Sequence, residues 1–449
     1  MTAIAVRATR PGADPRLVAE LRRRVDVRLE QATSPQGLSH AEDAARTEAA
    51  VWQEIETWTR QRATSGLPAL TRAEEQELAA AVMAALSGLG PLEVLLRRTD
   101  VENIFVFGCD SVFLELADGT TQPWPYSLAE SDAGLVALLE GMFARLGATS
   151  REFSVATPVG NVRLPAGGPL GARLAAVMQV TERPTAAIRL HRLVNATLDT
   201  LIGNGTVDTV LAGFLSAAVR AGLRIVVSGE WGSGKTTLLR ALCHEILPFE
   251  HVVTIEDERE LGLHTWPARH PLVTSMEARL PNAEGVGGIT VEQLLVQALR
   301  HSPRRVIVGE VRGGEVTTLL RALSTGAGGL CTLHADTAAG VFDRIANMAQ
   351  LATPPLPVDT AYRWTATAVD LIVHVRRRDR VDQGRPLRER FVSQVLEVGA
   401  VGDSGRPDAA TLLGPDPDTG HARAMFPPSP QIQERLRAHG LDMSSWAEA

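Results

Sequence analysis

A single lysine stands among the 449 residues of this chain, and its neighbours form a phosphate-binding pattern. Lysine and arginine together number 45, and every one of them except Lys235 is an arginine. The lysine completes the pattern G-x-x-x-x-G-K-[ST], in which a glycine-rich turn presents backbone N–H groups to phosphate oxygens. We therefore predict that nucleotide phosphates bind to the loop residues Gly229, Glu230, Trp231, Gly232, Ser233, Gly234, Lys235, Thr236 and Thr237.

The residue types at the end of this loop suit nucleotide chemistry. An arginine presents a broad planar fork, whereas a lysine is a compact point charge on a thin stem that can reach phosphates through a tight loop. This difference explains why Lys235 is kept in a chain that otherwise uses arginine. The hydroxyl of Thr236 is a ligand of the kind that phosphate-loop proteins offer to Mg²⁺.

The acidic stretch Thr254–Glu260 is a second candidate site. Its carboxylates include Glu256, Asp257 and Glu260, and it follows a predicted strand. At the carboxyl edge of a parallel sheet, beside a phosphate site, such acids can hold Mg²⁺ and activate water. The same residues are equally consistent with a solvated acidic turn, and the spacing alone does not choose between the two interpretations.

Two further strand ends carry polar side chains. The apolar run Arg305–Val308 leads into Gly309 and Glu310, which is the Walker B pattern with glycine in the usual aspartate position. Another short strand ends at His334, where an imidazole can sense phosphate. An isolated histidine is more often a hydrogen-bonded filler, so both interpretations of His334 stay open.

Strands and helices that could position these residues alternate from residue 198 onward. This alternation, with continuous apolar strands, indicates a largely parallel sheet that helices cover on both faces. The predicted strands are Leu223–Ser228, His251–Ile255, Arg305–Val308, Leu330–Leu333, Asp370–Arg376 and Glu389–Val398. The predicted helices are Val207–Ala221, Lys235–Ile246, Val291–His301, Glu315–Ser324 and Ala338–Gln350.

The earlier part of the chain has a different pattern. From about residue 14 to 63 it is helical and charged, with one apolar stripe at Val18, Leu21, Val25 and Leu29. A mixed α+β region follows. Its predicted helices are Arg72–Leu86 and Asp132–Leu146, and its predicted strands are Val101–Phe107, Ser111–Leu116, Val162–Leu164, Ala172–Met178 and Thr185–Leu190.

These patterns divide the chain into four predicted parts. They are a helical extension at residues 1–66, an α+β domain at 67–195, an α/β nucleotide-binding domain at 196–400 and a tail at 401–449. The tail is rich in Gly, Pro and Asp, so we expect a loose segment with a short helix near Ile432–Arg437.

Composition narrows the class of protein. The formal net charge of −7 argues against non-specific binding to nucleic acid or acidic membranes. Three scattered cysteines fit reduced thiols better than a disulfide framework. Because there is no long apolar run and no signal-peptide pattern, we expect an intracellular protein that does not span a membrane.

Five motifs in a fixed order give the chain a family resemblance. After the phosphate loop come Ile255–Leu261, Glu277–Gly285, Ala298–Glu315 and Ser324–Ala335. This order resembles the type II/IV secretion and pilus-assembly ATPases, and more narrowly their CpaF/TadA subgroup. The likeness extends from about residue 88 to residue 398. It implies an α/β fold, namely a RecA-like P-loop NTPase domain with a smaller α+β N-terminal domain and an N-terminal helical extension.

The resemblance also implies roles for single residues. Lys235 and Thr236 would bind the phosphates and Mg²⁺, and Glu260 would polarise the attacking water, with Glu256 and Asp257 near the metal.

Four more positions match the family by motif. Glu310 would act as the Walker B acid, which also lies near the metal, and His334 matches the closing histidine of the family's His box. Arg173 and Arg189 match N-domain arginines that approach the γ-phosphate.

The function implied by the likeness is Mg²⁺-dependent ATP hydrolysis that powers pilus assembly or protein secretion. The family works as a homo-oligomer, expected to be a hexamer, on inner-membrane platform proteins. We therefore expect a cytoplasmic protein at the inner face of the membrane, in contact with the membrane only through partners and without a nucleic-acid partner.

Two departures from the family pattern leave an alternative open. Ala327 stands where the His box normally has its first histidine, and Leu190 replaces a basic residue that is common after Arg189. A nucleotide-binding scaffold or regulator with little turnover is therefore a rival interpretation. A nucleic-acid translocase with the same core is a second rival, against which the acidic balance of the chain weighs.

Overall fold

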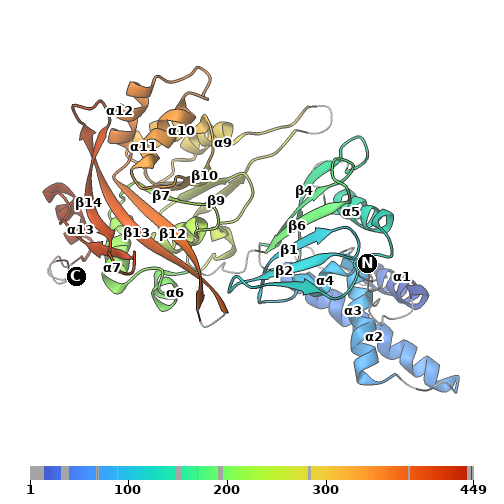
Figure 1. The fold of residues 1–449 in the computed structure, drawn as a ribbon. Helices are drawn as coiled ribbons and strands as arrows, with labels where there is room; N and C mark the ends of the chain where they lie inside the picture. The colour runs from blue at the N-terminus through green and yellow to red at the C-terminus, as the bar shows by residue number, and fades with distance from the viewer. Residues whose placement is uncertain are drawn as a thin grey trace, which may run out of the picture. The chain divides into compact units, whose positions relative to one another are not determined.

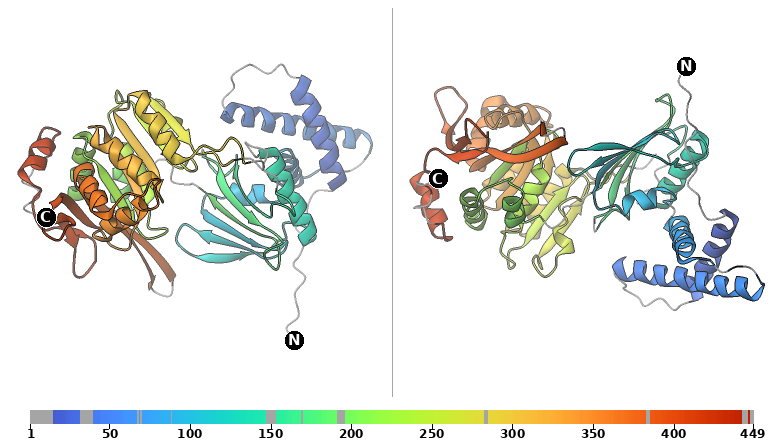
Figure 2. Two further views of the ribbon diagram at one scale, coloured as in Figure 1. Left: turned by 90° about the horizontal axis from the view of Figure 1, so that it is seen from above. Right: turned by 60° about the horizontal axis from the view of Figure 1, so that its bottom comes forward.

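The computed structural model describes residues 15–31, 40–66, 68, 70–87, 89–146, 153–168, 170–190, 196–281, 285–382, 385–441 and 446. By their internal contacts the residues form two compact units, Met1–Arg192 and Leu193–Ala449. Each unit is described below by itself (Figures 1 and 2).

The N-terminal unit begins with helices that share a small apolar core. The predicted stripe on the first helix is confirmed, because Leu21 and Val25 are fully buried against side chains of the next two helices. Val82 of the third helix completes this core, although the sequence boundary at residue 66 separated that helix from the other two. These three helices are α1 (Pro15–Gln31), α2 (His40–Thr64) and α3 (Arg72–Ser87), and the short α4 (Leu92–Leu96) that follows packs in the core of the sheet described next.

An antiparallel sheet with one long helix follows in the same unit. The strand order is β3-β2-β1-β6-β5-β4, and the apolar side of α5 (Asp132–Leu146) packs on this sheet. The sequence missed β3, an edge strand that contains Pro123, and edge strands tolerate proline. The strands are β1 (Val101–Phe107), β2 (Val112–Leu116), β3 (Thr121–Trp124), β4 (Val159–Leu164), β5 (Ala172–Val177) and β6 (Thr185–Leu190).

The C-terminal unit is built on a nine-stranded sheet in the order β15-β14-β13-β12-β7-β11-β10-β8-β9. From β12 to β9 every neighbouring pair is parallel, as predicted, and from β12 to β15 every pair is antiparallel. The strands are β7 (Ile225–Gly229), β8 (Val252–Glu256), β9 (Val273–Glu277), β10 (Arg305–Val311), β11 (Gly328–His334), β12 (Leu371–Asp382), β13 (Arg385–Val401), β14 (Pro407–Pro415) and β15 (Ala422–Ala424).

Helices cover both faces of this sheet, which makes it an α/β unit (Figure 1). Alternate strand residues enter opposite cores: Val227 packs with α6, α7, α8 and α13, whereas Val226 packs with α9, α10, α11 and α12. The α-helices are α6 (Leu198–Gly203), α7 (Thr209–Arg220), α8 (Lys235–Cys243), α9 (Val291–Ala298), α10 (Glu315–Ser324), α11 (Gly340–Ala349), α12 (Val358–Ala368) and α13 (Pro430–Arg437). Single 3₁₀ turns lie at Leu263–Thr265 and Leu299–His301.

The expectation of a loose tail after residue 400 is wrong. β13 continues to Val401, and β14 and β15 extend the sheet, with Leu412 and Leu413 fully buried. The Gly, Pro and Asp residues that suggested disorder belong largely to the turns between these strands. The short helix predicted near residue 432 exists as α13 and begins two residues earlier, where the Ser429 hydroxyl accepts a hydrogen bond from the Ile432 N–H.

Candidate active site

The phosphate loop leaves a central strand of the parallel sheet. All five residues of β7 are buried, and β11 and β12 pair with it on either side. Gly234 ends the loop with a φ of 96°, a left-handed conformation that glycine adopts without steric cost, and α8 begins at Lys235. The predicted strand, loop and helix are thus confirmed. The first N–H groups of α8 have no partner within the helix and are oriented for an anion.

Lys235 lies inside the loop, and its side chain is nearly buried. Its Nζ atom is 3.1 Å from the carbonyl oxygen of Gly229, 2.8 Å from that of Glu230 and 3.1 Å from Nδ1 of His334. An ammonium group can only donate, so Nδ1 of His334 accepts and the ring hydrogen lies on Nε2. The lysine is therefore held in the loop by three acceptors that a phosphate oxygen could replace.

A continuous set of contacts links this lysine to the acidic strand ends. His334 Nε2 is 3.1 Å from Glu310 Oε1, Glu310 Oε2 is 2.8 Å from Arg312 Nη2, and Arg312 Nη1 is 3.2 Å from Asp257 Oδ2. We call Lys235, His334, Glu310, Arg312 and Asp257 the polar chain. It joins the ends of β8, β10 and β11 to the phosphate loop, as expected for adjacent carboxyl ends of parallel strands.

The charge of Glu310 is set by its place in the polar chain. Burial alone would raise its pKa, but hydrogen bonds from His334 and Arg312 outweigh burial and lower the pKa to about 2. Glu310 is therefore ionised near neutral pH. The ring of His334 bridges the loop lysine and this carboxylate, an arrangement that both interpretations of His334, filler and functional group, allow.

Glu256, which we predicted to lie near the metal, is enclosed by protein. It is 3% exposed, and its Oε1 accepts hydrogen bonds from the backbone N–H groups of Glu260 and Leu261, both at 2.9 Å. Burial raises its pKa to about 7 in spite of these two bonds. Glu256 is thus a buried acid that shapes the turn carrying Glu260, and not part of a solvated acidic turn.

The packing of Glu256 explains the glycine in the Walker B segment. A Cβ atom on Gly309 would lie 2.9 Å from Cγ and 3.2 Å from Oε1 of Glu256. An aspartate at position 309 would therefore collide with the carboxylate that holds the Glu260 turn. Glu256 occupies the space that the usual aspartate side chain would need.

Glu260 lies on a turn that is held from two sides. Its N–H donates to Glu256, and its carbonyl oxygen accepts from Nη2 of the buried Arg240, whose Nε also donates to the carbonyl of Leu261 at 3.2 Å. The side chain of Glu260 is half-buried, and its charge acts on both Glu256 and Arg312. The predicted base is therefore beside the polar chain and on a fixed backbone.

Three features of this site were not found from the sequence. The indole of Trp231, 66% exposed, stacks on the imidazole of His334 with 5.4 Å between ring centroids and 9° between planes. The buried hydroxyl of Ser228 lies 2.9 Å from Nδ1 of His374, whose pKa burial and the nearby Arg376 lower to about 4. Arg312 lies within the motif Ala298–Glu315, but the sequence analysis gave it no role. Its position two residues after the Walker B acid Glu310 was a signal that could have identified it.

Comparison with known proteins now decides the family. The model of the type II/IV secretion system protein family matches residues 86–383. Rv3659c of Mycobacterium tuberculosis, a protein named for conjugal transfer, is 35% identical over 339 residues, which are 73% of this chain and 92% of that one. This chain belongs to the type II/IV secretion ATPases.

Two other relatives of this secretion ATPase are more distant or cover less of the chain. The type IV secretion system protein PtlH of Bordetella pertussis is 38% identical over 182 residues, which are 40% of this chain and 51% of PtlH. A crystal structure of the VirB11 ATPase from the Brucella suis type IV secretion system is 27% identical, covers 71% of this chain and 96% of its own, and has a TM-score of 0.35. The C-terminal unit is the RecA-like ATPase part of the fold, and the enzyme belongs to systems for ATP-driven secretion or pilus assembly.

The two predicted N-terminal arginines lie side by side in their own unit of the secretion ATPase. Arg173 of β5 and Arg189 of β6 are directly opposite each other, and Arg163 of β4 is directly opposite Arg173 on the other side. Three arginines therefore form a row across neighbouring strands. Leu190, the departure after Arg189, is buried in the core of this unit.

Magnesium would have to share its ligands with a nucleotide. Across the described residues, no group of three or more His, Cys, Asp or Glu side chains could hold a metal ion by itself. Mg²⁺ commonly takes one or two protein oxygens together with phosphate oxygens and water, so the residues present fit that kind of site. The half-buried hydroxyl of Thr236, second residue of α8, and the ionised Glu310 are suitable oxygen ligands.

In the part of the chain that the structure describes, no helix is both long enough and apolar enough to cross a membrane.

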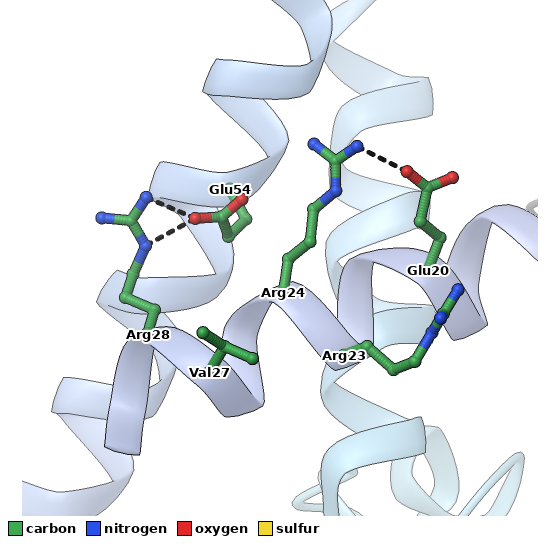
Figure 3. Close-up of a pocket in the computed structure, with 6 residues that line it drawn as sticks. All are labelled: Glu20, Arg23, Arg24, Val27, Arg28 and Glu54. Atoms are coloured by element: carbon green, nitrogen blue, oxygen red, sulfur yellow. Dashed lines mark hydrogen bonds and ion pairs between the residues drawn. The ribbon is translucent and has the colours of Figure 1, made fainter. Parts of the chain in front are cut away.

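A hollow of about 630 Å³ on α1 and α2 contains three arginines, among them Arg24 and Arg28. These two are paired with Glu20 and Glu54 respectively (Figure 3), so the hollow is a charged surface with internal ion pairs and carries no evident chemistry.

Proposed function

We propose that this secretion ATPase hydrolyses ATP with Mg²⁺ and powers pilus assembly or protein secretion through an inner-membrane platform protein. Within the family we place it in the CpaF/TadA subgroup, on the order of its five motifs. The observation that carries the proposed hydrolysis is the polar chain, because it connects the loop lysine to an ionised carboxylate and to the turn of Glu260.

Phosphoryl transfer needs positioning and charge stabilisation more than covalent chemistry. Loop N–H groups and Lys235 would bind the phosphates, with Lys235 exchanging the Glu230 carbonyl for a phosphate oxygen. Glu260 would accept a proton from the attacking water, and Glu310 would hold His334 toward the phosphates. Glu256 would keep the Glu260 backbone in place through its two amide hydrogen bonds.

Bound Mg²⁺ would neutralise phosphate charge, and Thr236 and Glu310 would be its protein ligands, with Asp257 near it. Arg173 and Arg189 would add positive charge at the γ-phosphate when the nucleotide is enclosed. The loss of the γ-phosphate would then release these two arginines and allow the N-terminal unit to move.

The assembly that would use this motion is a homo-oligomer, and we propose a hexamer. Its place would be the cytoplasmic side of the inner membrane, reached through platform proteins and not by a membrane-spanning segment. The net charge of −7 favours a protein partner over nucleic acid.

Steady-state phosphate release from the purified full-length protein tests this function. We expect Mg²⁺-dependent release that Lys235→Arg abolishes, because a guanidinium fork cannot replace the compact ammonium group in the loop. Tight ATP binding without phosphate release would favour the scaffold interpretation. Release that is strongly stimulated by DNA and falls steeply with added salt would favour the translocase.

A further inference from the structure

A two-stranded ribbon rich in arginine approaches the phosphate loop within the C-terminal unit. β12 pairs with β7 only as far as Val375, opposite Gly229, and beyond this point it pairs with β13 alone. Figure 1 shows the β12–β13 hairpin extending past the rest of the sheet. We call residues 376–390 of this hairpin the arginine ribbon, apart from residues 383 and 384, which lie outside the described part.

One cross-strand pair in the arginine ribbon is electrostatically unfavourable. The two cross-strand pairs beyond it join opposite charges. Arg378 is opposite Glu389 with a hydrogen bond of 2.9 Å, and Arg388 is opposite Asp379 with a hydrogen bond of 3.1 Å. The next pair toward the sheet is formed by two arginines, Arg377 and Arg390, directly opposite each other. Like charges directly opposite each other repel across a sheet, in contrast to the two neighbouring pairs.

This arginine pair is the part of the ribbon that contacts the phosphate loop. The Nε of Arg390 donates a hydrogen bond of 3.0 Å to the carbonyl oxygen of Gly232, and its Cδ packs 3.4 Å from where a Cβ on Gly234 would be. The Nη1 of Arg377 lies 2.8 Å from where a Cβ on Gly232 would be, and Arg377 is also paired with Asp379 at 2.9 Å.

The loop glycines therefore have a second role besides admitting phosphates. A Cβ on Gly229 would be 2.2 Å from the carbonyl oxygen of Val375, so a side chain at this position would push β12 away from the loop. A Cβ on Gly232 would lie 2.8 Å from the flexible end of Arg377, and one on Gly234 would only touch Arg390 at 3.4 Å. The loop thus packs tightly on β12 at Gly229 and lies against the two arginines at Gly232 and Gly234.

The hydrogen bond from Arg390 also has a directional effect. The Gly232 carbonyl and the Ser233 N–H belong to one planar peptide group and point in opposite directions. A hydrogen bond from a charged donor is stronger than a neutral one, so Arg390 restrains the orientation of this peptide plane, whose N–H also makes a long 3.4 Å hydrogen bond to the Glu230 carbonyl. Loop N–H groups are what a phosphate binds, and they bind best when their directions are already set.

We propose that Arg377 and Arg390 are positioning residues that clamp the phosphate loop and thereby strengthen its binding of nucleotide phosphates. The effect on nucleotide rests on the proposed function, whereas the effect on the loop does not. Two guanidinium groups beside the loop also favour an anion there over long range.

Hydrogen–deuterium exchange of the nucleotide-free protein tests the clamp directly. In the variants Arg390→Gln and Arg377→Gln, we expect peptides that cover residues 229–236 to exchange faster than in the wild-type protein. The matched control is Arg378→Gln, because Arg378 lies in the same ribbon but contacts Glu389 and the carbonyl of Thr419. Arg390→Lys, which keeps a charged donor, should restore slow exchange in part. Equal exchange in Arg390→Gln and Arg378→Gln would overturn the clamp.

Calorimetric titration with ADP and with a non-hydrolysable ATP analogue tests the consequence. Arg390→Gln should weaken both affinities about tenfold, as for the loss of one charge-assisted hydrogen bond, and Arg378→Gln should leave them unchanged. Faster loop exchange with unaltered affinity would also overturn the proposal. If the wild-type protein bound neither nucleotide, the proposed function would fail, and the exchange experiment would still decide whether the clamp exists.

Discussion

Each unit of this protein carries a pair of arginines directly opposite each other on neighbouring strands, and the two pairs differ in what surrounds them. In the N-terminal unit, Arg173 faces Arg189 and also a third arginine, Arg163, so positive charge accumulates along one row. In the C-terminal unit, Arg377 and Arg390 lie against the phosphate loop of their own unit, and Arg377 is also paired with Asp379.

This difference in surroundings indicates that two arginines directly opposite each other on neighbouring strands serve a different purpose in each unit. An arginine pair beside the phosphate loop, one member of which already donates to a loop carbonyl, can prepare that loop before any nucleotide arrives. A row of arginines in a separate unit is suited to act later, on charge that develops during the reaction. We therefore expect the ribbon pair to affect nucleotide binding and the N-terminal pair to affect turnover.

The largest expected effect comes from removing an N-terminal arginine. Arg189→Gln should lower kcat about 10³-fold, as for the loss of an arginine at the γ-phosphate, and change nucleotide affinity less than about threefold. Arg390→Gln should show the reverse, with weaker affinity and nearly normal kcat. Phosphate release at saturating ATP and calorimetric titration separate the two quantities. If both variants lost affinity and kcat in the same proportion, the division of labour would be wrong.

The next largest effect concerns the glutamates, which we expect to act in proton transfer and not in nucleotide binding. Glu260→Gln should lower kcat about 10²- to 10³-fold with nucleotide binding intact, because it removes the group that accepts the proton of water. Glu256→Gln keeps an oxygen acceptor for the amides of Glu260 and Leu261, so kcat should fall less than about threefold. Single-turnover phosphate release measures both variants. A normal rate in Glu260→Gln together with a slow rate in Glu256→Gln would mean that Glu256, and not Glu260, accepts the proton of water.

The sequence predicted the parts of this site that depend on local pattern. The loop around Lys235 could be found because strand, glycine-rich turn and helix are adjacent in the chain. The parallel strands could be found because both of their faces are buried and their residues are continuously apolar. The half-buried edge strand β9 lacked this signal and was missed.

Contacts between distant residues could not be predicted in the same way. His334 meets Lys235 across 99 positions of the chain, and Arg390 meets Gly232 across 158. Gly309 looked like a departure from the Walker B pattern until the packing of Glu256 explained it. In the tail, glycine and proline marked turns between paired strands, and their number could not distinguish turns from disorder.

A charge reversal in the N-terminal row tests whether its arginines are there for function and not for stability. Arg173→Glu would place a carboxylate directly between Arg163 and Arg189. Opposite charges across strands stabilise by roughly 0.2–1 kcal/mol per pair, which offsets the interactions that Arg173 itself loses, so we expect the free energy of unfolding to change by less than about 1 kcal/mol together with a large loss of kcat. Urea unfolding without nucleotide, compared with Arg163→Gln, measures the stability. A destabilised Arg173→Glu protein with normal kcat would make the row structural.

The smallest effect concerns Arg183 of the same unit, which is paired with Asp110 and Asp132. Arg183 binds both carboxylate oxygens of Asp132 at 2.7 Å, and the N–H of Cys109 donates to the same carboxylate at 2.8 Å. The hydrogen bonds from Arg183 hold the pKa of Asp132 well below its usual range. Because the folded-state pKa is depressed, this pair stabilises the fold above the unfolded pKa of about 3.9 and loses its effect as the pH falls further.

Asp132→Asn should therefore lower the free energy of unfolding by about 0.5 kcal/mol at pH 7, a small value because the side chains of Arg183 and Asp132 are more than one-third exposed, and by less near pH 2, where the effect is only partly lost because the folded-state pKa lies lower still. Asp110→Asn is the matched control, since Asp110 contacts Arg183 through one 2.9 Å ion pair and is 48% exposed. Urea unfolding at both pH values gives the difference. A loss of stability that is equal at both pH values would mean that Asp132 acts through packing and not through its charge. The comparison of arginine environments in the two units would then depend only on Arg173 with Arg189 and on Arg377 with Arg390.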